Sequence, residues 1–364
     1  MFERIDRKDW EDYRWHIKNR IRDPEVLGKY FNLEKSEVER IKKVTKIYIL
    51  GVTPYYLSLA DREDPKDPIR KQILPSDKEI DPLIQKEGEE NPFKEETHIK
   101  GLTHRYKDRV LMVVTTSCAV YCRHCMRKRI FKEGERAFTK KEIDTMIEYV
   151  KKHEDIKDVL ISGGDPFMLE NSKIEYILRK LREIPHVEII RFGTRLPVLL
   201  PQRFYDRELL EILEKYSPIW INTHFNHPKE ITEDSEKAVF NLLRHGIPVN
   251  NQTVLLKGIN DNPETMLELL RKLLRIRVKP QYLFHCDPVK GVMHFRTSLE
   301  KGLEIMKFLR SRISGMGIPT YAIDLPGGKG KVPVLPHYIK KKEGNTYTFE
   351  AIDGSLVEYK IEPL

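Results

Sequence analysis

Short apolar runs alternate with amphipathic helical patterns over residues 109–324, and this alternation restricts the folds open to the chain. The runs are Val110–Val114, Val159–Ile161, Val187–Arg191, Ile219–Asn222, Val249–Leu256, Gln281–His285 and Thr320–Asp324. The helical stretches between them include Lys140–Lys152, Ile174–Arg182, Glu236–Arg244, Glu264–Leu274 and Leu299–Arg312. Strand–helix alternation is typical of parallel βα units, so it predicts an α/β fold: a full or partial (βα) barrel, or a doubly wound open sheet.

Polar residues gather at the carboxyl ends of the predicted strands, and this favours the barrel. They are Ser162–Asp165, Arg191, Asn222, His224, Asn251, Gln252, Asp287 and Asp324. In (βα) barrels the active site is assembled at that face from several strands. About six or seven units therefore predict a partial (βα)6-type, TIM-like barrel with a site at the carboxyl ends of its strands.

The flanking regions differ from the barrel segment. Residues 1–100 suggest a charged, helical N-terminal region with an amphipathic pattern at Val38–Ile49 and a loop or extended connection at Pro65–Pro92. The end of the chain predicts a short β hairpin, with Tyr347–Glu350 and Leu356–Lys360 on either side of a turn at Asp353-Gly354. We therefore expect a helical region at 1–100, the barrel at 101–335 and a C-terminal tail at 336–364.

The composition indicates a soluble, cytoplasmic protein. No apolar stretch approaches the roughly 20 residues needed to cross a bilayer, and the N-terminus lacks the apolar core of a signal peptide. The net charge of +9 comes from 65 Lys and Arg against 56 Asp and Glu, which are interspersed along the chain. Because no block of like charge stands out, we expect neither a nucleic acid nor a membrane as a partner.

Three of the four cysteines form the pattern CxxxCxxC, at Cys118, Cys122 and Cys125, directly after the first predicted barrel strand. A structural zinc site needs four ligands, usually as two separated pairs, and no second pair is present. A zinc knuckle completed by His124 or by a distant ligand is the alternative. Three thiolates on one loop suit a [4Fe–4S] cluster whose fourth iron stays open to another molecule.

This cysteine pattern resembles that of the radical S-adenosylmethionine (SAM) enzymes. The resemblance implies a [4Fe–4S] cluster held by the three cysteines, SAM bound at the open iron and a barrel of the radical SAM type. One βα unit later, Ser162, Gly163, Gly164 and Asp165 resemble the glycine-rich motif with which this superfamily holds the SAM amino group. Glycines let a backbone approach a ligand closely because they have no Cβ.

Several longer stretches narrow the resemblance to lysine 2,3-aminomutase, from about residue 10 to the C-terminus. They are Gly101–Arg109, Cys122–Arg129, Leu200–Arg203, Asn222–Pro228, His294–Thr297 and Asp324–Val334. The members of this family are isomerases that move the α-amino group of L-lysine to the β-carbon, using SAM, the cluster and pyridoxal 5′-phosphate (PLP). A reducing electron-donor protein is implied as a partner, and we expect a homodimer.

The resemblance also assigns roles to individual residues near PLP. Lys331 matches the family's PLP-attached lysine, although Lys329 replaces the usual glycine two residues earlier and competes with it. Arg105 and Arg109 match the arginines that bind the PLP phosphate, with Tyr106 beside the cofactor. Without the resemblance, the two arginines would be one helical turn apart on a solvated face.

Substrate and SAM contacts follow from the same resemblance. Arg127 matches the partner of the substrate carboxylate, and Asp287 and Asp324 match the carboxylates that receive the lysine ε-ammonium. His224 and Gln252 match positions near SAM, or are satisfied core polar residues.

The sequence therefore predicts an aminomutase that interconverts L-lysine and β-lysine. The alternatives are an enzyme that makes β-lysine for modification of an elongation factor, and an aminomutase for another amino acid. A zinc-containing protein that binds nucleic acid is the remote alternative.

Overall fold

The computed structural model describes residues 5–94, 97–132 and 134–361. A nine-stranded sheet has its strands in chain order, and a separate three-stranded sheet follows it. The strands are β1 (Leu102–Tyr106), β2 (Arg109–Thr115), β3 (Asp158–Gly163), β4 (Ile189–Gly193), β5 (Ile219–Thr223), β6 (Val249–Leu255), β7 (Lys279–His285), β8 (Thr320–Leu325), β9 (Gly330–Pro333), β10 (Ile339–Glu343), β11 (Thr346–Glu350) and β12 (Leu356–Lys360).

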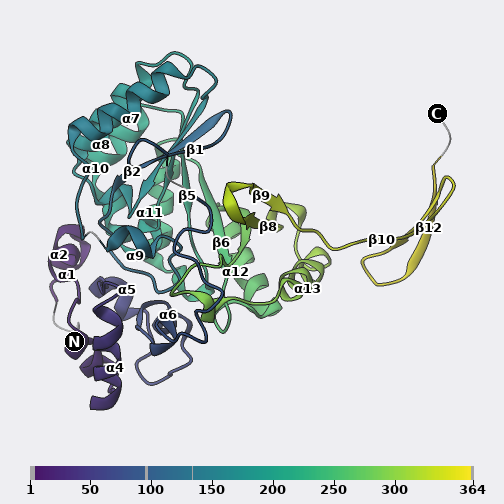
Figure 1. Ribbon diagram of the computed structural model, residues 1–364, viewed down its shortest axis with the longest axis horizontal. Coiled ribbons are helices and arrows are strands. Elements are labelled where there is room, and N and C mark those ends of the chain that lie inside the picture. Colours follow the sequence, from purple (N-terminus) through teal and green to yellow (C-terminus); the bar gives the residue numbers. More distant parts are fainter. Residues whose placement is uncertain (1–4, 95–96, 133, 362–364) are drawn as a thin grey trace.

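Strands β2 to β8 are parallel, and this confirms the predicted barrel-like α/β fold. The sheet curves into a nearly closed barrel, and its two edge strands, β1 and β9, pair antiparallel with β2 and β8 (Figure 1). The helices that accompany the parallel strands are α7 (Lys140–Lys152), α8 (Asn171–Arg182), α9 (Leu196–Leu199), α10 (Arg207–Lys215), α11 (Glu233–Arg244), α12 (Pro263–Arg275) and α13 (Leu299–Arg310).

Alternate strand residues face the helices and form the core. Val110 and Met112 of β2 are buried, as are Val159 and Ile161 of β3, which pair with them across the ladder. These side chains belong to one hydrophobic cluster with the apolar faces of the helices, such as Ile143 of α7. Burial of one face fixes the register, since a slip by one residue would turn the apolar set away from the helices.

The opposite face of the sheet is largely half-buried and carries polar pairs among apolar residues. Gln252 of β6 donates to Gln281 of β7 at 3.1 Å, and Arg191 of β4 pairs with Asp158 of β3 at 2.8 Å. Arg191 was expected at the carboxyl end of its strand, and this prediction was wrong. Because β4 continues to Gly193 and Asp158 begins β3, the Arg191 side chain reaches toward the amino end of the neighbouring strand.

The N-terminal region packs against the barrel through short helices. These are α1 (Arg7–Glu11), α2 (Tyr13–Lys18), α3 (Pro24–Tyr30), α4 (Lys35–Thr45), α5 (Pro54–Ser58) and α6 (Pro68–Ile73). Helix α6 lies in the segment expected to be a loop. Asp67 caps it by accepting from two backbone N–H groups, and Pro68 occupies the first helical position, where it needs no hydrogen bond. Leu27, Tyr56 and Ile69 join the barrel's own hydrophobic cluster.

The C-terminal hairpin prediction is confirmed, and the structure adds a strand to it. Strands β11 and β12 pair antiparallel around the turn at Asp353-Gly354, and the lysine-rich β10 pairs with β11. The three strands extend away from the barrel (Figure 1).

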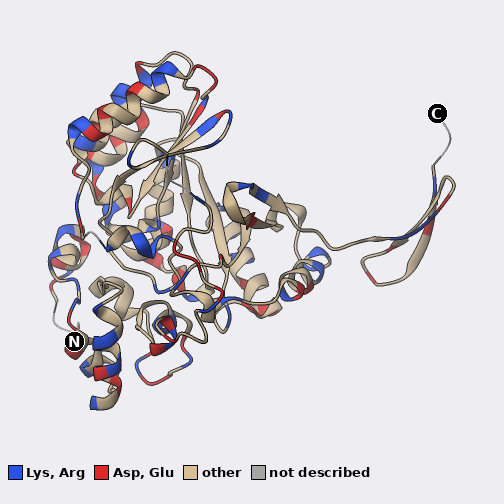
Figure 2. Ribbon diagram, viewed as in Figure 1, with Lys and Arg blue, Asp and Glu red and all other residues tan. Residues whose placement is uncertain are grey.

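Charged residues of both signs are interspersed along the outer helices, as on α7 and α8 (Figure 2). No helix in the described ranges combines the length and apolar character that a membrane crossing requires.

Candidate active site

The three cysteines of the CxxxCxxC pattern lie on the loop that follows β2, at the carboxyl end of the sheet, and all are free thiols. Two of their sulfurs already receive hydrogen bonds. The guanidinium of Arg195 donates from Nη1 to Cys122 Sγ at 2.9 Å, and the backbone N–H of Arg127 donates to Cys125 Sγ at 3.4 Å. Such donors suit thiolate ligands, whose negative charge they stabilise.

The loop is better suited to a multi-iron cluster than to a single metal ion. Within the described ranges, no three His, Cys, Asp or Glu side chains are grouped so that they could hold one ion. In a [4Fe–4S] cluster each thiolate binds its own iron, so the sulfurs need not meet at one point. The His124 ring lies against Phe295, and its Nε2 is 3.3 Å from Asn226 Nδ2. The predicted zinc alternative, with His124 as fourth ligand, therefore finds no support.

The glycine pair at the end of β3 holds the start of the cysteine loop. A Cβ on Gly163 would lie 2.4 Å from the Thr115 carbonyl oxygen, and one on Gly164 would lie 2.3 Å from that of Ser117. The N–H of Gly164 donates to Thr115 at 2.7 Å. Gly163 also has a φ of +131°, which other residues rarely adopt. The glycines are therefore required for close backbone packing beside the cysteines.

Asp165 is buried and holds the turn that follows β4. Its carboxylate accepts from Thr194 Oγ1 at 2.8 Å, from the Arg195 backbone N–H at 2.7 Å and from the Phe167 N–H at 3.2 Å. Burial raises its pKa to about 6 despite these hydrogen bonds. Asp165 thus fixes the turn that carries Arg195.

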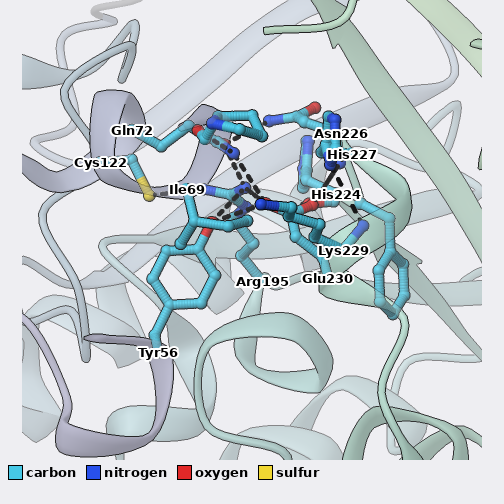
Figure 3. Close-up of polar contacts among 12 residues, drawn as sticks. Tyr56, Ile69, Gln72, Cys122, Arg195, His224, Asn226, His227, Lys229 and Glu230 are labelled. Atoms are coloured by element: carbon cyan, nitrogen blue, oxygen red, sulfur yellow. Dashed lines mark hydrogen bonds and ion pairs between the residues drawn. The ribbon is translucent and has the colours of Figure 1, made fainter. Parts of the chain in front are cut away.

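Arg195 is the main site residue that the sequence analysis missed. Its side chain enters a buried network with Tyr56, Gln72 and Glu230 and contacts Cys122 (Figure 3). Tyr56 and Gln72 come from α5 and α6, so the N-terminal region supplies part of the environment of the cysteine loop.

A second buried network connects the cysteine loop to Glu79. Glu79 accepts from Arg123 at 2.9 and 2.6 Å and from Lys128 Nζ at 2.5 Å. Arg123 stands between two of the cysteines, and Lys128 follows the last of them. Burial alone would raise the pKa of Glu79, but the two cations outweigh burial and hold it at about 2.

Glu79→Gln is expected to lower the free energy of unfolding by about 3–5 kcal/mol, because it leaves two buried cations without their counter-charge. The depressed pKa of Glu79 stabilises the folded chain above pH 4.5. We expect this contribution to disappear as the pH falls from 4.5 toward 2. Urea unfolding followed by circular dichroism measures both effects.

Glu90→Gln is the matched control, because the ion pair of Glu90 with Lys132 is about half-exposed. Such a pair contributes roughly 0–1 kcal/mol. Equal urea midpoints for the two variants would contradict the structural role of Glu79.

The end of β5 carries buried polar atoms that suit a ligand. Asn222 Nδ2 and Thr223 Oγ1 are buried and have no hydrogen-bond partner among the described residues. His224 follows them, and burial together with the Arg195 charge lowers its pKa to about 4, so its ring is neutral at pH 7. Asn251 and Gln252 lie mid-strand in β6, which continues to Leu255, so their expected place at its carboxyl end was wrong. Unpaired buried polar groups require an explanation, and an absent polar cofactor supplies one here.

The predicted PLP residues lie together at one edge of the barrel. Arg105 and Arg109 belong to the antiparallel strands β1 and β2, so the alternative of a solvated helical face was wrong. Tyr106 accepts from the Lys331 backbone N–H at 2.9 Å, and the Arg109 guanidinium stacks 3.8 Å from the Tyr106 ring centre.

Lys331 faces Asp324 across the β8–β9 pair. Its Nζ lies 3.2 Å from Asp324 Oδ2, while Arg105 Nη1 lies 2.8 Å from Asp324 Oδ1. Lys329 is exposed, and the described residues include no ion partner for it. The geometry thus favours Lys331 as the site lysine.

Two further predicted residues lie at the same carboxyl edge. Arg127 Nη1 donates to Ser162 Oγ at 3.2 Å, which brings the cysteine loop against the end of β3. Asp287 follows β7, the parallel neighbour of β8. The cysteine loop, Arg127 and Asp287 thus lie at the carboxyl ends of the parallel strands. Arg109 instead begins β2, where it pairs with Asp158 of β3, and its guanidinium stacks on Tyr106, which contacts Lys331.

Comparison with known proteins agrees with this arrangement. Residues 112–270 match the family model of the radical SAM superfamily, and residues 306–363 match that of lysine-2,3-aminomutase. An L-lysine 2,3-aminomutase of Acetoanaerobium sticklandii is 44% identical over 99% of this chain and 86% of its own length. The chain belongs to the lysine 2,3-aminomutase family.

Two other members of the lysine 2,3-aminomutase family are informative. A protein of Aquifex aeolicus, which carries the L-lysine 2,3-aminomutase name provisionally, is 65% identical over 99% of this chain and 98% of its own length. A glutamate 2,3-aminomutase of Clostridioides difficile is 44% identical over 98% of this chain and 84% of its own length. As a member of this family the chain is an aminomutase, an isomerase that uses a [4Fe–4S] cluster and SAM.

Proposed function

We propose that this aminomutase converts L-lysine to β-lysine by moving the α-amino group to the β-carbon, with PLP as a further cofactor. The assignment of lysine as the substrate rests on the ion pair between Asp324 and the Lys331 ammonium, whose atoms are 3.2 Å apart. That ammonium is chemically the same group as the side-chain end of a lysine substrate. The carboxylate is 9% exposed and therefore strongly favours a cation as partner.

Charge at this end of the site discriminates between lysine and glutamate. Relatives named for each substrate are 44% identical to the chain, so overall identity does not choose between them. Asp287 follows β7 and Asp324 lies near the end of the neighbouring strand β8, so both carboxylates belong to the same edge of the sheet. A glutamate side chain would bring a third negative charge there, and like charges repel.

The remaining residues take roles that their positions support. Cys118, Cys122 and Cys125 would hold the cluster, and the polar end of β5, with His224 and Gln252, would receive SAM beside Ser162–Asp165. Arg127 would bind the substrate carboxylate with its planar fork. Arg105 and Arg109 would bind the PLP phosphate, with Tyr106 supporting the strand that presents Lys331.

When bound, the reduced cluster and SAM supply a carbon radical that removes hydrogen from the substrate, and PLP supplies the carbonyl carbon that carries the migrating nitrogen. A reducing partner protein would deliver the electron. The chain's own groups orient the substrate between Arg127 at its carboxylate and Asp324 at its ammonium. Arg105 and Lys331 both contact Asp324 in this structure. With PLP bound, both would contact the cofactor instead, and Asp324 would be available to the substrate ammonium.

Asp324→Asn tests the substrate proposal. The change keeps the shape of the side chain but removes its charge, so we expect KM for L-lysine to rise about 10- to 100-fold, as for loss of one charged hydrogen bond. Initial rates of β-lysine formation with the iron-loaded enzyme measure this, and the parent chain should give no β-glutamate from L-glutamate.

Glu175→Gln serves as the control, because Glu175 lies on the outer helix α8 and pairs with Lys215 of α10 at 2.7 Å. Its KM should stay near that of the parent. A rise no larger for Asp324→Asn than for Glu175→Gln, or turnover of glutamate by the parent, would overturn the assignment of lysine.

A further inference from the structure

We propose that Arg195 is a positioning residue that sets the reduction potential of the cluster through its hydrogen bond to Cys122. The inference rests on the proposed function in one respect, namely that the cysteine loop holds a [4Fe–4S] cluster. The redox step is addition of one electron, from an external one-electron reductant, to the oxidised cluster.

The guanidinium of Arg195 has a fixed orientation. Its Nε donates to the His224 carbonyl oxygen at 2.9 Å. Its Nη2 donates to Gln72 Oε1 at 2.6 Å and to Glu230 Oε1 at 2.8 Å. These three acceptors hold the planar fork so that Nη1 is directed at Cys122 Sγ, 2.9 Å away (Figure 3).

Glu230 holds the guanidinium of Arg195 in place. Its carboxylate is fully buried and accepts from Tyr56 Oη at 2.6 Å, from Gln72 Nε2 at 2.9 Å and from the Asn226 N–H at 2.6 Å. With its acceptor positions filled, Glu230 cannot turn away from Arg195. The network therefore presents a buried positive charge and an N–H donor to the cluster ligand at a constant distance.

The effect on the cluster follows from charge. Reduction adds one negative charge to the cluster and its thiolates, and a hydrogen bond to a ligand sulfur stabilises that charge. Burial preserves the interaction because water does not screen it. Arg195 therefore raises the reduction potential, which makes the first electron easier to deliver.

The test is a redox titration of reconstituted enzyme, followed by the electron paramagnetic resonance signal of the reduced cluster. In Arg195→Gln we expect the ratio of reduced to oxidised cluster, at the parent's midpoint, to fall at least tenfold. For a one-electron couple this equals a shift of about 59 mV to more negative potential. Iron and sulfide are assayed first in every sample.

Two further variants keep the test decisive if Arg195→Gln folds poorly. Arg195→Gln combined with Glu230→Gln removes both buried charges and leaves no unpaired carboxylate, and it should show the same negative shift. Arg195→Lys keeps a positive charge but lacks the fork, so its shift should be smaller.

Arg203→Gln is the matched control. Arg203 is also fully buried, and its guanidinium donates to Phe167, Asp206 and Asn171 at 2.6–2.9 Å. None of these partners belongs to the cysteine loop, so the cluster in Arg203→Gln should have the same reduction potential as the cluster in the parent.

Unchanged potentials in iron-replete Arg195 variants would overturn this inference and leave the proposed function intact. Equal shifts in the Arg195 and Arg203 variants would overturn it as well. A parent chain that binds no iron and sulfide would instead overturn the cluster assignment itself.

Discussion

Cys125→Ser is expected to reduce SAM cleavage to the background seen without iron. In the proposed site three thiolates hold three irons of the cluster, and a serine hydroxyl does not replace a thiolate at neutral pH. In the parent chain Cys125 Sγ also receives the Arg127 N–H at 3.4 Å, so its loss disturbs the loop that carries Arg127. Anaerobic reconstitution, iron and sulfide analysis and the yield of deoxyadenosine with dithionite measure the effect.

Cys286→Ser is the control for this prediction. Cys286 is the fourth free cysteine of the chain, and it is buried just beyond β7, away from the CxxxCxxC loop in the sequence. This variant should retain the full iron content and SAM cleavage. If Cys125→Ser kept the cluster while Cys286→Ser lost it, the ligand assignment would be wrong.

Lys331→Ala is expected to abolish the PLP adduct that borohydride reduction traps. Lys331 is held in the site by the Tyr106 hydroxyl at its backbone and by Asp324 at its Nζ. An alanine cannot form the covalent bond between a lysine amine and PLP. Mass spectrometry of reduced, digested protein locates the adduct, and β-lysine formation should fall to background in the same variant.

Lys329→Ala separates the two candidate lysines. The described residues include no ion partner for the Lys329 side chain, so its loss should leave the adduct and most of the activity in place. An adduct that survives in Lys331→Ala and disappears in Lys329→Ala would transfer the role to Lys329.

Much of the barrel could be predicted from local pattern alone. Helix α7 has the bounds expected from its apolar spacing, because Thr139 caps it and Ile143, Met146, Ile147 and Val150 make one buried stripe. The cysteine loop follows β2 as expected. Strand β1 was missed because its polar residues, Thr103, His104 and Arg105, give no apolar run.

The Arg195 network illustrates what the sequence does not reveal. The strand-end rule was applied to Arg191, since the apolar run appeared to stop there, whereas β4 continues to Gly193. The correct strand end would have indicated Arg195. Its partners Tyr56 and Gln72 lie more than 120 residues away, and only tertiary packing brings them together.

The ion pairs of Asp324 could not be predicted from the sequence either. The resemblance assigned Arg105 and Lys331 to PLP and Asp324 to the substrate ammonium, and the structure joins the three in one charged cluster. The cross-strand register of β8 and β9 produces this contact, and register depends on the glycine-rich turn between them.

The most direct test follows the nitrogen atom itself. Reconstituted enzyme is incubated anaerobically with SAM, PLP, dithionite and L-lysine that carries ¹⁵N only at the α-amino group, and the product is analysed by NMR and mass spectrometry. We predict β-lysine with the label on the β-carbon, and none from Cys125→Ser. Deoxyadenosine without labelled β-lysine, or neither product from iron-replete protein, would contradict the proposed reaction.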